Sequence, residues 1–171
     1  MIVSPNNLLR INVGFIINLP VGESRDFSLD ISRIYLKPDL ELSNLNGGVR
    51  ITRTAQGLLT HVILNALTPS ECVRCLANFN LPLHVDFSEH YAFSENSLEE
   101  GGMLLPENAQ LDLSAVIREY MLLDIPISPL CKPDCKGLCP ICGENQNEIT
   151  CDHGDAEGNP ALSVLKSFLD H

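Results

Sequence analysis

The chain has 171 residues, 44% of them hydrophobic, which suits one domain with a core or one domain with a metal-bound appendage. A formal net charge of −11 argues against binding to nucleic acid through a basic surface, because affinity for phosphate comes mainly from Lys and Arg. No apolar run is long enough to span a bilayer, and Arg10 and Asn12 interrupt the apolar stretch near the amino terminus, which is therefore a poor signal peptide. We expect an intracellular protein without membrane contact, in which cysteines stay reduced.

The first part of the chain is predicted to form antiparallel β-strands. Apolar residues alternate with others over residues 11–17, which is typical of a strand. A longer pair of strands is expected at roughly 40–54 and 58–68, because the short link between them contains Gly57 and suits a hairpin. A further strand is expected over 81–87, extending toward Phe93.

Residues 94–110 are predicted to be an acidic loop, because Glu alternates there with Ser, Asn and Gly and little apolar surface can be buried. A helix is expected near residues 112–123, with Asp112 as its N-cap and apolar residues recurring at helical spacing. A last short helix is expected from Asn159-Pro160, since Asn is a good cap and Pro suits the first helical position. Its apolar stripe comprises Leu162, Leu165 and Leu169.

These patterns predict an α+β fold: an antiparallel, partly closed β-sheet, one helix packed on it, and a zinc-bound C-terminal segment. The expected division is a β-rich domain over 1–130, which carries a C-x2-C motif at 72–75, and a cysteine-rich segment with the C-terminal helix over 131–171.

Seven cysteines and one histidine form the most informative pattern in the chain. These candidate metal ligands are Cys72, Cys75, Cys131, Cys135, Cys139, Cys142, Cys151 and His153. Tetrahedral zinc takes four thiolate or imidazole ligands, so eight ligands predict two closed sites and two Zn²⁺ per chain. Bound in this way, seven ionised thiols and two ions would take the net charge to about −14. A catalytic zinc needs an open coordination position, so we expect structural metal and no enzymatic activity.

Two partitions of these ligands are compatible with the spacing. In the first, Cys72 and Cys75 join Cys131 and Cys135, and the last four ligands make a local second site. In the rival partition, Cys72 and Cys75 join Cys139 and Cys142, and the other four bind a second ion or none. The first is preferred because its second site closes a loop of only about 15 residues, and closing a longer loop costs more entropy.

Other candidate sites carry little weight. His61, His84, His90 and His171 are predicted to be ordinary residues without a metal. The chain contains no H-E-x-x-H, P-loop, G-x-S-x-G or deaminase signature. Arg74, Lys132 and Lys136 flank the cysteines and are expected to offset thiolate charge in preference to forming an RNA-binding patch.

The runs 71–76, 111–113 and 129–147 resemble the YceD family, the large ribosomal RNA subunit accumulation proteins of bacteria and plastids. The resemblance implies a role in 23S ribosomal RNA accumulation, hence in large-subunit assembly, and no known enzymatic activity. The family pattern usually ends in C-x-C, whereas this chain ends in Cys151-Asp152-His153, which fits a site of three Cys and one His. Some members lack the second cluster, which implies that the first site is the more fundamental one.

From this resemblance and the zinc pattern we expect a non-enzymatic factor in the cytoplasm, or in the plastid of a photosynthetic eukaryote. Its expected partners are ribosome assembly components or ribosomal proteins near nascent large-subunit RNA, with weak or no direct binding to naked RNA. The alternative is a redox- or zinc-responsive regulatory protein whose cysteines release metal on oxidation. A third possibility, a zinc-dependent RNA-processing enzyme, requires that His153 does not bind the metal.

Overall fold

The computed structural model describes residues 8–97 and 102–153, and these residues form two compact units. The first unit contains residues 8–70 and 79–129, and the second contains residues 71–78 and 130–153. The Cys72–Cys75 turn therefore groups with the cysteine-rich segment, and the division expected at residue 130 stays a prediction. The C-terminal helix expected from Asn159, with His171, and the centre of the acidic loop at 98–101 lie outside the described residues.

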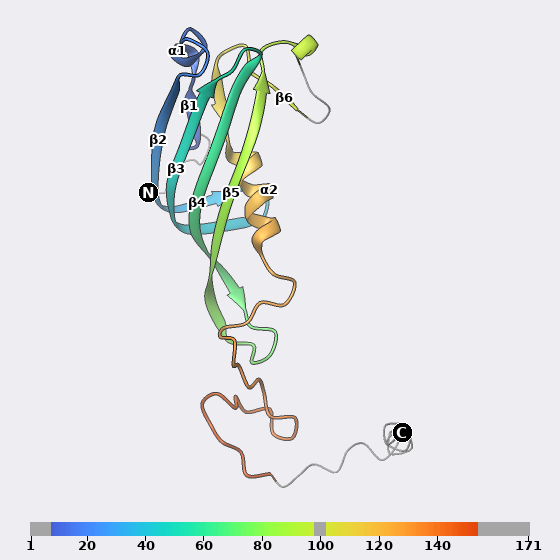
Figure 1. Cartoon of the computed structure of the whole chain (residues 1–171). Coiled ribbons are helices and arrows are strands. Elements are labelled where there is room, and N and C mark those ends of the chain that lie inside the picture. The colour runs from blue at the N-terminus through green and yellow to red at the C-terminus, as the bar shows by residue number, and fades with distance from the viewer. Residues whose placement is uncertain (1–7, 98–101, 154–171) are drawn as a thin grey trace, which may run out of the picture. The chain divides into compact units, whose positions relative to one another are not determined.

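The first unit is built on a five-stranded sheet with the strand order β2-β3-β4-β5-β6 (Figure 1). Its strands are β2 (Ser24–Leu36), β3 (Leu40–Arg53), β4 (Gly57–Glu71), β5 (Asn78–Ala92) and β6 (Met103–Leu104). The alternation that predicted the hairpin is clearest in β4, where Leu58, Thr60, Val62 and Leu64 are fully buried and Leu59, His61 and Ile63 between them are more exposed. The expected pair of strands at 40–54 and 58–68 is confirmed as β3 and β4.

The sheet is mixed, so the prediction of an antiparallel sheet is wrong at one edge. Strand β6 pairs with β5 in parallel, with Tyr91 opposite Met103 and Ala92 opposite Leu104. A strand of two residues has no alternation by which a sequence could reveal it. The prediction that the sheet is partly closed is not supported either. In the described part of the chain, β2 and β6 are the two edge strands of this sheet.

A second, two-stranded sheet joins β1 (Arg10–Asn12) to β7 (Gln110–Asp112), with Ile11 opposite Leu111. The strand predicted over 11–17 is wrong beyond Asn12, because α1 (Gly14–Ile17) follows. The Asn12 side chain accepts the Gly14 amide at 3.0 Å and so starts a turn. Val13 and Ile16 are then both fully buried, and their spacing of three suits a helical turn and not a strand.

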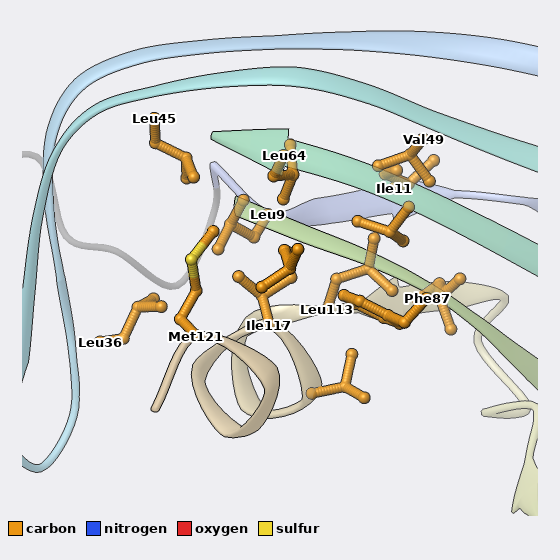
Figure 2. Close-up of a cluster of buried hydrophobic side chains, with 14 of the residues drawn as sticks. Leu9, Ile11, Leu36, Leu45, Val49, Leu64, Phe87, Leu113, Ile117 and Met121 are labelled. Atoms are coloured by element: carbon orange, nitrogen blue, oxygen red, sulfur yellow. The ribbon is translucent and has the colours of Figure 1, made fainter. Parts of the chain in front are cut away.

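Helix α2 (Ser114–Asp124) covers the sheet and confirms the helix predicted near 112–123. The predicted N-cap is wrong by one residue, because Leu113 holds that position and Asp112 ends strand β7. Its apolar face carries Leu113, Ile117 and Met121, which point toward the sheet residues Leu64 and Phe87 (Figure 2). Ile11 of β1 and Leu9, just before this strand, also belong to this cluster (Figure 2). The core is mostly aliphatic, and its burial is the main force that stabilises this unit.

Candidate metal centre

The first C-x2-C motif forms a tight turn between β4 and β5. The Cys72 carbonyl accepts the Leu76 amide at 2.9 Å, and the Cys72 amide donates to the Ala77 carbonyl at 3.0 Å. Leu76 takes a left-handed backbone conformation with φ of 57°. This turn brings the Cys72 and Cys75 thiols to the same side, so that both can approach one ion.

The second C-x2-C motif repeats this backbone geometry. The Cys139 carbonyl accepts the Gly143 amide at 2.9 Å, and the Cys139 amide donates to the Glu144 carbonyl at 2.8 Å. Gly143 is also left-handed, with φ of 78°. The two turns are therefore equivalent knuckles, and they differ at the left-handed position in having Leu76 or Gly143.

The first cluster consists of Cys72, Cys75, Cys131 and Cys135, whose four sulfur atoms all lie within 4.8 Å of one another. The Sγ atoms of Cys72 and Cys135 are 3.7 Å apart, and those of Cys75 and Cys131 are 3.6 Å apart. All are buried except Cys131, which is half-buried. The cluster joins two segments that lie more than 50 residues apart in the sequence.

Three residues around the first cluster hold the segment of Cys135 against the first knuckle. Arg74 Nη1 donates to the Cys135 carbonyl at 3.0 Å, and the Arg74 carbonyl accepts the Leu138 amide at 3.1 Å. Asn147 Nδ2 donates to Cys135 Sγ at 3.3 Å. Gly137 is left-handed, and a Cβ atom there would lie 3.1 Å from the Arg74 carbonyl oxygen. These contacts orient the ligands from outside, as hydrogen bonds commonly do around a metal centre.

The second cluster consists of Cys139, Cys142, Cys151 and His153, whose ligand atoms likewise lie within 4.8 Å of one another. Cys142 and Cys151 bring their Sγ atoms to 3.5 Å. Cys139 is buried, Cys151 is half-buried, and both Cys142 and His153 are exposed. The second cluster is therefore local in sequence and far more open to solvent than the first.

The sulfur separations distinguish a metal centre from disulfides. A disulfide needs its sulfurs about 2.05 Å apart, and all seven cysteines are free thiols. A tetrahedral ion with metal–sulfur bonds of about 2.3 Å has sulfur–sulfur edges of about 3.8 Å. The observed 3.5–3.7 Å separations fit that edge. Each cluster could therefore hold one metal ion.

The thiols of the first cluster have unequal proton affinities. Burial alone would raise the pKa of Cys72, but backbone hydrogen bonds, first from Cys131 and then from Cys75 and Arg74, outweigh it and lower that pKa to about 6. Burial, with hydrogen bonding to Cys75 and Cys135, raises the pKa of Cys131 to about 12.

The second cluster shows the same contrast. Backbone hydrogen bonds from Cys142 and Ile141 lower the pKa of Cys139 to about 7, whereas hydrogen bonding to Cys142 and burial raise the pKa of Cys151 to about 12. In each cluster one thiol, Cys72 or Cys139, thus favours the thiolate form, while its neighbour, Cys131 or Cys151, resists a second negative charge. A divalent cation removes that repulsion, so both donor sets fit a metal ion.

The structure brings together all eight residues that the sequence singled out, grouped as in the first partition and not as in the rival one. Arg74 was expected to offset thiolate charge, but its hydrogen bond to the Cys135 carbonyl was not predicted, nor were the roles of Gly137 and Asn147. The run 129–147 contains Gly137 and Asn147, but spacing alone does not show which side chain reaches a sulfur.

The other described histidines lie on the sheet of the first unit. His61 Nε2 is 2.7 Å from Asp86 Oδ1, His84 Nδ1 is 2.8 Å from Asn65 Oδ1, and His90 Nε2 is 3.1 Å from Thr54 Oγ1. Each therefore has an ordinary hydrogen-bond partner.

Comparison with known proteins shows a match between this chain and one protein family. Residues 61–169 match the family model described as large ribosomal RNA subunit accumulation protein YceD. That match covers more than half of the chain and contains both clusters. No solved structure matches the chain. Among the described residues, no helix is both long and apolar enough to cross a membrane.

Individual relatives come from bacteria and plants. An uncharacterized protein of Mycobacterium bovis is 33% identical over 101 residues, which are 56% of this chain and 48% of that protein. An Arabidopsis thaliana protein named large ribosomal RNA subunit accumulation protein YCED homolog 1, chloroplastic, is 42% identical over 65 residues, 38% of this chain and 20% of that protein. The chain thus spans about half the length of the mycobacterial relative.

Proposed function

Because the chain belongs to the YceD family of large ribosomal RNA subunit accumulation proteins, we propose that it supports the accumulation of 23S ribosomal RNA and the biogenesis of the large ribosomal subunit. The plant relatives carry this role in their names. The observation that carries the proposal is that both cysteine clusters lie inside the residues matched by the family model.

In this proposal each cluster binds one structural zinc ion. Thiolate and imidazole ligands favour zinc, and seven thiols with one imidazole make two tetrahedral sets. The first ion would stabilise the contact between the segments 71–78 and 130–135, and the second would stabilise residues 139–153. Four protein ligands leave no position for a reacting water, so the proposed factor is not an enzyme.

The proposed partners are ribosome assembly components or ribosomal proteins near nascent large-subunit RNA. A chain with a net charge of −11 is repelled by phosphate and attracted by the basic surfaces of RNA-binding proteins. Its proposed location is the cytoplasm, or the plastid in a photosynthetic eukaryote.

Depletion of the protein tests this function. We expect the ratio of large-subunit to small-subunit ribosomal RNA to fall, and the unaltered gene to restore it. Cys75→Ser should restore it poorly, because the variant lacks one ligand of the buried cluster, whereas exposed Val21→Ser in the first unit is the matched control. An unchanged ratio after depletion would contradict the proposal.

The second candidate function is a redox- or zinc-responsive regulator. The exposure of Cys142, whose Sγ atom lies 3.5 Å from that of the half-buried Cys151, favours it, because peroxide can reach an exposed cysteine and a neighbouring cysteine can then form the disulfide. Thiol titration before and after mild peroxide separates the two roles. A purely structural protein should keep both zinc ions, whereas a regulator should release the second and lose two thiols to a disulfide.

A further inference from the structure

The two knuckles share their backbone hydrogen bonds but not the residue at the left-handed position. Gly143 occupies that position in the second knuckle and Leu76 in the first. Glycine adopts positive φ without cost, whereas a leucine Cβ crowds the following carbonyl oxygen. The first knuckle is therefore strained at Leu76, and the second shows that the same turn forms without this strain.

Burial of the Leu76 side chain does not offset the free energy of this strain. Leu76 is 56% exposed, although most leucines of the chain's core are almost fully buried. Val73, in the same turn, is 52% exposed. The hydrogen bond from Leu76 to Cys72 uses only the backbone amide, which any residue except proline supplies. Neither the turn nor the sulfur geometry thus requires the Leu76 side chain.

A strained residue with an exposed apolar side chain points to an interaction outside the folded unit. We propose that Val73 and Leu76 form an apolar anchor that inserts into a socket on a protein of the large-subunit precursor particle. This inference rests on the proposed function and adds the contact surface to it.

Charge and chemistry favour a protein socket with a basic rim over RNA. Glu71 precedes the knuckle, is exposed, and has no ion pair among the residues described. The exposed Arg74 inside the knuckle donates to the Cys135 carbonyl beside the cluster, where its charge offsets that of the thiolates. The charge left beside the anchor is therefore acidic, which favours a cationic rim and repels phosphate. Aliphatic side chains recognise nucleic-acid bases mainly through the thymine methyl group, which RNA lacks. Two aliphatic side chains such as Val73 and Leu76 instead contribute affinity when a protein pocket buries their apolar surface away from water.

Leu76→Gly provides a sharp test, because it removes the side chain and gives the first knuckle the residue that the second already uses. We expect unchanged zinc content and an unchanged or higher unfolding temperature, since the strain is relieved. The probe is large-subunit precursor particles purified on sucrose gradients from source cells depleted of the protein. We expect the affinity of the variant for these particles to fall at least about tenfold, as for the loss of a central apolar contact.

Leu123→Ser is the matched control, because Leu123 lies on α2 in the first unit and is 81% exposed. It removes a similar apolar side chain and should bind the particles like the unaltered chain. Val73→Ser should weaken binding in the same direction as Leu76→Gly.

Three outcomes would overturn the inference while the proposed function survives. The first is equal binding by Leu76→Gly and the unaltered chain, and the second is loss of zinc or a lower unfolding temperature in Leu76→Gly. The third is that deproteinised ribosomal RNA binds Leu76→Gly more weakly than the unaltered chain by the same factor as the particles do, which would make RNA the partner. Failure of the unaltered chain itself to bind particles would instead contradict both proposals.

Discussion

Asp112 ends strand β7 and stabilises the first turn of helix α2. One carboxylate oxygen accepts the Ser114 amide at 3.0 Å, and the other accepts Arg10 Nε at 2.9 Å from strand β1. Partial burial would raise the pKa of Asp112, but hydrogen bonds from Ser114 and Arg10 outweigh it and hold that pKa below its ordinary value. The folded state therefore favours the charged carboxylate.

We expect Asp112→Ala to lower the free energy of unfolding by about 1 kcal/mol at pH 7, as for loss of a side-chain hydrogen bond. A depressed folded pKa contributes stability above the unfolded pKa of about 3.9, and this is lost as pH falls through the folded value. The difference between the two proteins should therefore shrink below about pH 4 in denaturant titrations. Asp30→Ala is the control, since Asp30 makes no side-chain hydrogen bond or ion pair in the described part of the chain. A difference that persists at low pH would contradict this role.

Gly47 and Gly48 are adjacent in β3 but differ in what surrounds them. A Cβ atom on Gly47 would lie 2.1 Å from the Ile63 carbonyl oxygen, and φ there is +145°. A Cβ atom on Gly48 would lie no closer than 3.8 Å to the Phe27 carbonyl oxygen. The strand β4 thus approaches β3 so closely at Gly47 that no side chain fits.

We predict that Gly47→Ala lowers the free energy of unfolding by roughly 2–4 kcal/mol, because backbone must move and φ is unfavourable. Gly48→Ala, the matched control one residue away, should change it by no more than about 0.5 kcal/mol. Urea denaturation measures both. Similar losses in the two variants would show that close approach of the strands is not the cause.

At the scale of elements, the two clusters join different stretches of the second unit. The first cluster joins the turn 71–78 to residues 130–135, whereas the second lies wholly within residues 139–153. Loss of a ligand from the first should therefore affect two distant segments. Loss of a ligand from the second should affect one.

Hydrogen exchange of the zinc-bound protein can test this difference. Cys75→Ser should reduce amide protection in both 71–78 and 131–138, because one ion holds both segments. Cys142→Ser should reduce it mainly from residue 139 onward. Equal loss throughout the unit in both variants would contradict the separate roles of the clusters.

The sequence predicted elements whose pattern is long and regular. The β3–β4 hairpin and helix α2 carry clear periods. Spacing left two partitions of the eight candidate ligands open, and the one preferred for its shorter loop matches their grouping in the structure. Strand β2 was not singled out, because charged residues such as Asp26 and Arg33 dilute its alternation. Strand β6 and helix α1 are too short to show a period, and their form depends on tertiary contacts. The contact of Asn147 with Cys135 depends on a fold that spacing does not specify.

The whole molecule carries twice as many acidic as basic residues, 22 against 11. Several of its arginines are already paired with carboxylates, including Arg50 with Asp26 at 2.6 Å and Arg118 with Asp39 at 2.6 Å. These arginines are therefore less available to phosphate. This balance is the reason that we expect docking on basic protein.

We expect purified protein to bind naked ribosomal RNA no more tightly than about 10⁻⁴–10⁻⁶ M at physiological salt, the range of non-specific binding. Replacing Lys132 and Lys136 together by Glu should then leave ribosomal RNA levels unchanged wherever folding and zinc content are intact. Fluorescence anisotropy with 23S fragments measures the affinity. Tight, sequence-selective binding would contradict docking through protein.

The central claim is that two zinc ions organise the second unit, and native mass spectrometry of protein purified without chelator tests it most directly. We predict two zinc ions per chain, and one in Cys142→Ser, where the buried first site remains. A chain that holds one zinc ion, and still holds one after His153→Ala, would contradict the two-site account. A chain that holds none would remove the structural role of metal altogether.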